Sequence, residues 1–247
     1  MATSSRVGDQ YEISEISRSG AGVHEIPGTG AFVALTDRSN GDARRARSWS
    51  YVHQVHGSTV AVLEAPGALL GSPLGRAHAP EALSLVEADG LVSVSREACL
   101  GVLGADCALV GLASPEGVIA AAHAGWRGLV AGVLAETVAL MQRLGATEVV
   151  AVLGPCIHAE CYAFGEGDLD TVESVLGPSV RASTSRGEAA LDLPAAVGVA
   201  LARAGARLEA SIGGCTACDS RWYSHRARRD VERHALGISR SPERLAS

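Results

Sequence analysis

A cysteine and a histidine with metal-binding chemistry flank a predicted β-hairpin. The segment "ADC" ends at Cys107, and the segment "HAGWRG" begins at His123. Two apolar runs lie between them and are joined by the short turn "PEG", so pairing of the runs would bring the thiol and the imidazole to the same sheet end. Both side chains are suited to zinc or copper. His56, in "HQVHG", could be a third ligand and leave a fourth position open to water or substrate.

Other interpretations of these residues remain open. Cys107 could be a small buried side chain, and the two histidines could be polar ends of strands. Cys107 could also act as a nucleophile instead of a metal ligand. If a metal is bound, the pKa of its water would approach about 7, and the water could act as nucleophile or base. Cys107 and His123 are therefore the catalytic candidates.

The segment "HAGWRG" also predicts a junction between a strand and a helix. The amides from Gly125 to Gly128 would lie at the first helical turn, where unpaired N–H groups and the helix dipole favour an anion. Arg127 adds a two-pronged donor suited to phosphate, and the glycines let the backbone approach a ligand closely. The alternative is a tight turn in which Trp126 covers the core and Arg127 is solvated.

The remaining soft ligands and basic residues are less specific. "CIHAEC" and "CTAC" could form a closed zinc site, and a lone Cys-x-x-Cys could be a redox pair. We expect instead that Cys156, Cys161, Cys215 and Cys218 are free thiols and form no second metal site. The arginines of "SHRARRD", Arg226 among them, could clamp a phosphate or form a solvated turn.

Short β-rich runs and helical segments must position these side chains. Apolar and alternating runs predict strands at 31–37, 90–95, 99–105, 108–114, 118–123, 148–155 and 207–213. A pair of strands is expected around "HG" within 51–64, and 207–213 is expected to be the last strand. Helical spacing and caps predict helices at 128–145, 167–177 and 192–205.

The order of these elements predicts the fold class. Strands and helices alternate only partly, and short turns join several strands, which favours an α+β fold with mixed sheets. The two runs on either side of "PEG" should be adjacent antiparallel strands. We expect one domain over residues 1–247, with residues 1–30 a loosely ordered extension.

Composition excludes several functions. The chain has 247 residues and a net charge of −6, which disfavours non-specific binding to nucleic acid or to an anionic membrane. All 21 basic residues are arginine, which excludes a Schiff-base lysine and a P-loop. No secretory signal or apolar span is evident, so a cytoplasmic protein is expected. The histidines are too dispersed for a cluster of several coppers.

The order of the motifs carries a family resemblance. "QVHG", "ADG", "GADC", "HAGWRG", "LGPCIHAECY" and "CT…YSHR" follow one another along the chain. They resemble the laccase-domain family, once labelled multicopper polyphenol oxidases and now regarded as purine nucleoside phosphorylases. Bacterial members have also been described as peptidoglycan-editing factors. The resemblance implies a mixed β-sandwich flanked by helices, and one zinc, or alternatively copper, at His56, Cys107 and His123.

The resemblance also implies a reaction and a set of substrate contacts. Family members cleave adenosine, inosine and methylthioadenosine with phosphate, and can deaminate adenosine. The implied catalytic residues are Cys107, His123 and Arg127. The implied substrate and phosphate contacts are Arg38, Gln54, Gly125, Trp126, Arg127, Tyr162 and Arg226.

The chain departs from the family pattern before and after these motifs. Of the segments that family members have before "YVHQVHG", only "TDRSNGD" is present, so a connecting segment is shortened. Leu109 stands where a proline is usual. Two alternatives to the phosphorylase are therefore kept. One is a hydrolase or amidase for cell-wall precursors with Cys107 as nucleophile, and the other is a non-catalytic metal-binding protein.

Overall fold

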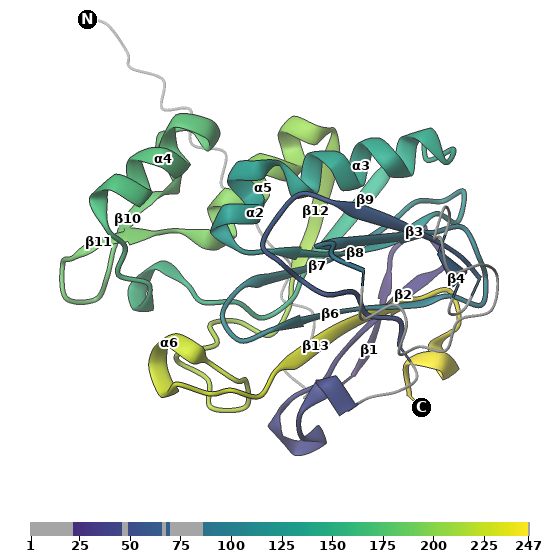
Figure 1. Ribbon diagram of the computed structural model, residues 1–247, viewed down its shortest axis with the longest axis horizontal. Helices are drawn as coiled ribbons and strands as arrows, with labels where there is room; N and C mark the ends of the chain where they lie inside the picture. The colour runs from purple at the N-terminus through teal and green to yellow at the C-terminus, as the bar shows by residue number, and fades with distance from the viewer. Residues whose placement is uncertain (1–21, 46–48, 66–67, 70–85, 247) are drawn as a thin grey trace, which may run out of the picture.

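The computed structural model describes residues 22–45, 49–65, 68–69 and 86–246 (Figure 1). Within these residues the larger sheet has seven strands in the order β12-β9-β7-β8-β5-β3-β4. Their bounds are β3 Val60–Ala65, β4 Ala68–Leu69, β5 Gly90–Ser93, β7 Ala108–Ala113, β8 Ile119–Ala124, β9 Val149–Leu153 and β12 Ala206–Ser211. The sheet is mixed, because β12 runs parallel to β9 and β3 runs parallel to β5, whereas the other pairs are antiparallel.

A second sheet packs against the first and completes a sandwich. In the described residues it has four strands in the order β1-β2-β13-β6. Their bounds are β1 Val23–Ile26, β2 Ala31–Leu35, β6 Cys99–Gly104 and β13 His234–Ser239. Figure 1 shows this sheet below the larger one, with α2, α3 and α5 on the opposite side. The predicted α+β sandwich flanked by helices is confirmed.

The helices divide into a layer on the larger sheet and two outlying groups. The layer consists of α2 Trp126–Ala131, α3 Val133–Arg143 and α5 Leu193–Ala204. The outlying elements are α4 Glu166–Leu176 with the hairpin β10 Arg181–Ser183 and β11 Ala189–Leu191, and α6 His225–Arg228. Short 3-10 turns are η1 Arg38–Asn40, η2 Ala43–Arg45, η3 Ala159–Cys161, η4 Pro178–Val180 and η5 Pro242–Leu245. Among the described helices, none combines the length and apolarity needed to cross a membrane.

Strand β7 shows why the central runs are so apolar. Val110 and Leu112 pack in the core under the helices, whereas Leu109 and Ala113 pack in the core between the sheets. Successive side chains of a strand point to opposite faces, so a strand covered on both faces is apolar throughout. The predicted pairing across "PEG" is confirmed, because β7 and β8 are antiparallel neighbours with Leu109 opposite His123.

Two predicted elements differ in the structure. The helix predicted at 128–145 is split into α2 and α3 by Gly132, whose left-handed φ of 91° ends one helix and precedes the next. The strand pair predicted within 51–64 is wrong, because the strand there is β3, preceded by irregular backbone with an isolated bridge at His53. That irregular segment carries His56 to the site.

The ends of the chain were also misjudged. β12 is not the last strand, because β13 follows it and lies in the middle of the smaller sheet between β2 and β6. The segment "HALGIS" contains polar and small residues, so its sequence did not indicate that β13 is buried. Part of the predicted loose extension is ordered, because β1 pairs with β2. Residues 1–21 of that extension lie outside the described residues.

Candidate metal centre

The structure brings the three predicted ligands together at one end of the β7–β8 pair. The donor atoms of His56, Cys107 and His123 all lie within 4.8 Å of one another. Cys107 Sγ is 3.8 Å from His56 Nε2, and the two imidazole rings meet edge to face with centroids 4.8 Å apart. Two imidazoles and one thiolate at this spacing fit zinc or copper, with room for a further ligand.

Hydrogen bonds to the carboxylate of Asp89 fix the geometry of this trio. This fully buried carboxylate accepts a 2.8 Å hydrogen bond from His123 Nδ1, which turns Nε2 towards the trio. The same carboxylate accepts backbone N–H bonds from Val55, His56 and Gly57 at 3.2, 3.0 and 2.6 Å. One side chain therefore positions both histidine ligands. Asp89 was not among the predicted site residues, although it lies in the motif "ADG".

Local backbone conformation also shapes the site. His56 has a φ of 62° and Asp106, immediately before Cys107, has a φ of 107°, in the left-handed region that side-chain-bearing residues rarely adopt. Gly125 is required by space, because a Cβ there would lie 3.0 Å from both Cys107 Sγ and His56 Cδ2. The turn after β8 is thus built against the trio.

The electrostatics favour the form of Cys107 that binds a metal. Burial alone would raise the pKa of this thiol, but the charges and hydrogen bonds of His123 and His56 outweigh it and lower the pKa to about 6. Burial would lower the pKa of His123, but Cys107 and Asp89 raise it to about 9. Without metal, the two opposite shifts in pKa favour a thiolate–imidazolium pair. A thiolate is both the metal-binding and the nucleophilic form.

A wall of aromatic and arginine side chains extends from the start of α2. The ring of Trp126 meets Phe164 edge to face at 5.5 Å, and Phe164 meets Tyr162 at 5.1 Å. Arg127 lies 4.3 Å over the Trp126 ring, and Arg226 lies 5.0 Å over the Tyr162 ring. This wall combines flat apolar surfaces with two guanidinium groups, which suits a planar base and an anion.

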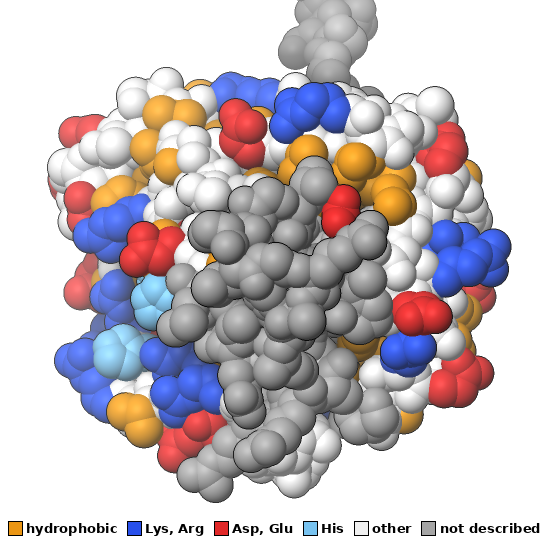
Figure 2. Space-filling view, turned by 45° about the vertical axis from the view of Figure 1, so that its right-hand side comes forward, with side chains coloured by type: hydrophobic (Ala, Val, Ile, Leu, Met, Phe, Trp, Pro, Cys, Tyr) orange, Lys and Arg blue, Asp and Glu red, His pale blue; other side chains and the backbone are white. Residues whose placement is uncertain are grey.

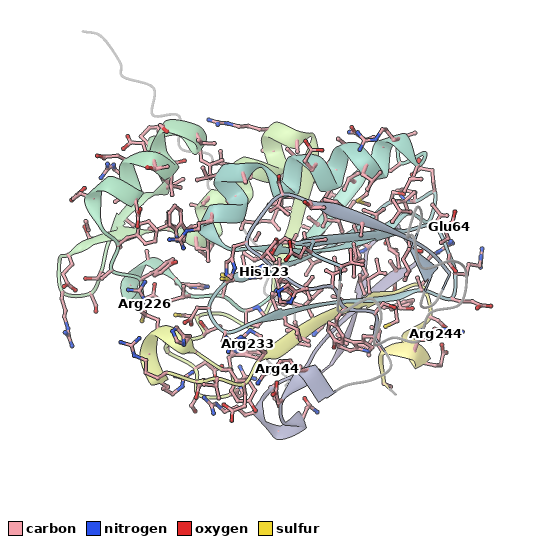
Figure 3. All side chains as sticks on the ribbon, viewed as in Figure 1. Arg44, Glu64, His123, Arg226, Arg233 and Arg244 are labelled. Atoms are coloured by element: carbon pink, nitrogen blue, oxygen red, sulfur yellow. The ribbon has the colours of Figure 1, made fainter. Side chains whose placement is uncertain are left out.

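The wall lies near the trio. Burial raises the pKa of Tyr162, and the charges of Cys107, Arg226 and Arg127 also act on its hydroxyl. Asp106, the neighbour of Cys107, accepts a 2.6 Å bond from the backbone N–H of Arg226 and a 2.7 Å bond from the Thr216 hydroxyl. Figure 3 shows His123 near the centre of the view and Arg226 to its left, nearer the edge of the molecule.

Arginines are unevenly distributed despite the acidic net charge. Figure 2 shows arginine and histidine side chains gathered at the left of one face. Within 221–233, Arg221 pairs with Asp219, and Arg228 donates to the carbonyls of Thr216 and Trp222. These two arginines hold the loop together, whereas Arg226 lies against the aromatic wall.

Two predicted substrate contacts are engaged within the protein. The amide of Gln54 makes two 2.8 Å bonds to the backbone of Leu103, one donated and one accepted, and so fastens the segment before His56 to β6. Arg38 forms an ion pair with Asp230 and lies 4.5 Å over the Tyr223 ring. Gly128 packs closely as well, since a Cβ there would lie 3.1 Å from the carbonyl oxygen of Gly57. These contacts indicate that the three residues position neighbouring segments of the protein.

Sequence comparison gives one family and several relatives. Residues 36–240 match the family described as multi-copper polyphenol oxidoreductase laccase. A purine nucleoside phosphorylase of Streptomyces coelicolor is 37% identical over 188 residues, covering 75% of this chain and 72% of the relative. Another, from Streptomyces griseus, is 35% identical over 189 residues, covering 75% and 71%.

Solved structures share the fold. The Neisseria meningitidis protein NMB0706 superposes with a TM-score of 0.72 at 25% identity, covering 90% of this chain and 99% of that chain. YlmD from Geobacillus stearothermophilus gives a TM-score of 0.71 at 24% identity, covering 91% and 97%. The sandwich with its helical layer is therefore a shared architecture.

Proposed function

Because the chain belongs to the multi-copper polyphenol oxidoreductase laccase family, we propose that it is a metal-dependent purine nucleoside phosphorylase. The observation that carries the proposal is the placement of the trio of His56, Cys107 and His123 beside the wall of aromatic and arginine side chains. The names of the Streptomyces relatives support the same activity. The substrates would be a purine nucleoside, such as adenosine, inosine or methylthioadenosine, and inorganic phosphate.

The side chains of this site divide the work of the reaction. Phosphate oxygen would form a bond to C1′ of the ribose while the glycosidic bond breaks, and the bonding pair would leave with the base, which is then protonated. Arg127 and Arg226 would hold phosphate, and the Tyr162 and Trp126 rings would pack on the purine. A divalent ion at the trio would act as a Lewis acid on a substrate or water oxygen.

We propose zinc as the resident metal, with copper as the alternative. One thiolate and two imidazoles suit both ions, and with Zn²⁺ they leave a net charge near +1. Such a centre accepts an anionic fourth ligand, which agrees with a phosphate or hydroxide oxygen. Bound hydroxide would also allow adenosine deamination, which we propose as a side activity.

The decisive experiment measures adenosine turnover with and without phosphate. We expect phosphate-dependent release of adenine and ribose 1-phosphate, loss of turnover after chelation, and recovery after zinc is added back. Ammonia release measured in parallel reports deamination. A zinc-loaded protein that releases no base in phosphate contradicts the proposal and favours a non-catalytic metal-binding protein.

A second candidate rests on the order of Cys107, His123 and Asp89. The donor atoms of Cys107 and His123 lie within 4.8 Å of one another, and His123 Nδ1 is bonded to Asp89, which is the order of a nucleophile, a base and an orienting carboxylate. It would support a hydrolase or amidase for cell-wall precursors. Metal content separates the two candidates, because a nucleophilic Cys107 requires no metal. Full metal content after Cys107→Ala would favour the nucleophile.

A further inference from the structure

A second group of soft ligands lies on the loops outside the trio. The donor atoms of Glu160, Cys161, Cys215 and Cys218 all lie within 4.8 Å of one another. Glu160 and Cys161 belong to η3, whereas Cys215 and Cys218 belong to the loop after β12. The two pairs are more than 50 residues apart in sequence, with Cys161 and Cys218 separated by 57 positions. Tertiary structure alone brings them together.

The spacing of these donors matches a tetrahedral metal site. Cys161 Sγ is 3.3 Å from Cys218 Sγ, which in turn is 3.7 Å from Glu160 Oε1. A tetrahedral zinc with bonds of about 2.3 Å to sulfur holds its sulfur ligands roughly 3.8 Å apart, so small side-chain adjustments suffice. Cys215 and Cys218 also have the Cys-x-x-Cys spacing of structural zinc sites.

The surroundings of the cluster supply the outer support that thiolate ligands need. The backbone N–H of His158 donates to Cys215 Sγ at 3.4 Å, which would stabilise a thiolate. His158 Nδ1 also lies 3.9 Å from Glu160 Oε1. Cys215 is buried, Cys161 is half-buried, and Glu160 and Cys218 are exposed, so an ion has access from solvent.

We propose that Glu160, Cys161, Cys215 and Cys218 bind a second divalent metal ion of the zinc class in a closed, structural site. Three thiolates and a carboxylate fill the four positions of a tetrahedral zinc, so no position is left for substrate. This proposal replaces the expectation of free thiols, in which the two segments were loops with incidental cysteines. It does not depend on the proposed phosphorylase activity.

The second ion would fasten the loops that carry the aromatic wall. Tyr162 directly follows Cys161, and Thr216 directly follows Cys215 and donates to Asp106. Asp106 also accepts from the backbone of Arg226. The ion would therefore connect the loop that carries Tyr162 to the loop that is bonded, through Asp106, to Arg226. Its role is to hold the wall, without contact to the reacting atoms.

The test is the metal content of the full chain, purified under reducing conditions after growth in zinc. We expect about two zinc ions per chain in the parent and about one in Cys218→Ala. The exposed Glu160→Gln variant should weaken zinc binding at the same site without disturbing the core. Cys99→Ala, which removes a buried thiol of a separate core cluster, is the matched control and should keep both ions.

Cobalt provides an independent readout. Thiolate-to-cobalt absorption grows with the number of thiolate ligands, and the second site has three where the trio has one. Cys218→Ala should remove most of this absorption, whereas Cys107→Ala should remove little. Unchanged zinc content in both Cys218→Ala and Glu160→Gln would overturn the proposal. A Cys161–Cys218 disulfide in the reduced, zinc-grown protein, found by thiol counting, would overturn it as well.

Discussion

The trio and the second cysteine cluster share ligand types but differ in support. Cys107 and His123 lie at one end of the β7–β8 pair, and His56 lies on the irregular segment before β3. The buried carboxylate of Asp89 accepts hydrogen bonds from His123 and from the backbone of His56, and so orients both histidines. The cluster of Glu160, Cys161, Cys215 and Cys218 lies on loops and is partly exposed. The first arrangement has three donors and an open position, and the second has four donors. We therefore expect the trio, with oriented ligands and an open position, to take part in the chemistry, and the cluster to hold the loops together.

Among the proposed variants, Cys107→Ala should have the largest effect on metal content and activity. It removes the one thiolate of the trio, so we expect loss of one metal ion and a fall of phosphorolysis to below about 0.1% of the parent. The fold should persist, because the thiol is only half-buried. Metal analysis, turnover and circular dichroism of the same preparation check this result. An active Cys107→Ala enzyme would remove the trio from the mechanism.

Alkylation of metal-stripped protein should separate the two groups of thiols by pKa. The pKa of Cys107 is lowered to about 6, whereas hydrogen bonding with Cys161 and burial raise the pKa of Cys218 to about 12. At pH 7 Cys107 should react at least about 100-fold faster, because its thiolate fraction outweighs its lower intrinsic nucleophilicity. Mass spectrometry after timed alkylation measures both rates. Equal rates at pH 7 would contradict the prediction.

The same pKa values fix how pH affects the stability of metal-stripped protein. The lowered pKa of Cys107 gives stability at high pH that is lost as pH falls through about 6. The raised pKa of His123 gives stability at low pH that is lost as pH rises through about 9. The paired charges should therefore stabilise the fold most between these limits. Thermal unfolding from pH 5 to 10 should show the maximum in the parent and a weaker one in His123→Gln.

Asp89→Asn should weaken the trio without removing a ligand. The amide keeps the size of the carboxylate but loses its charge, so metal affinity and activity should fall by about 10- to 100-fold. Asp168→Asn, at an exposed position in the first turn of α4, is the control and should leave both unchanged. Competition with a zinc chelator measures the affinity. Parent affinity in Asp89→Asn would show that the carboxylate does not tune the metal.

Arg127→Ala should alter substrate binding and leave the trio intact. Removing this exposed guanidinium should raise the KM for phosphate by about 10-fold, since a charged hydrogen bond contributes roughly 1.5 kcal/mol. Metal content should be that of the parent. Steady-state kinetics with varied phosphate checks this expectation. A fall in metal content would place Arg127 in the support of the trio instead.

Cys218→Ala should have the smallest effect on activity. Loss of the second ion would loosen the Tyr162 and Arg226 loops, so kcat/KM should fall by only about 3-fold while the melting temperature falls by several degrees. Calorimetry with and without added zinc measures the second effect. Zinc should raise the melting temperature of metal-stripped parent more than that of the variant. An equal rise in the melting temperature of parent and variant would show that the cluster containing Cys218 does not bind a stabilising zinc ion.

The sequence by itself determined the parts of the molecule that depend on short separations. The turn "PEG" allowed only a tight reversal, so the β7–β8 pairing and the meeting of Cys107 with His123 could be predicted. Continuous apolar runs gave the central strands, because strands buried on both faces need no polar side. The site of the "HAGWRG" junction followed from the same pattern.

Tertiary structure decided everything that joins distant segments. Asp89 meets both histidines only because β5 lies beside β8, and β13 could be placed in its sheet only through pairing with β2 and β6. The two halves of the cysteine cluster meet because the loops after β9 and β12 lie side by side. An isolated backbone β-bridge between residues Cys156 and Cys215 joins these loops. Such contacts arise from packing over long separations, which local propensity and periodicity do not encode.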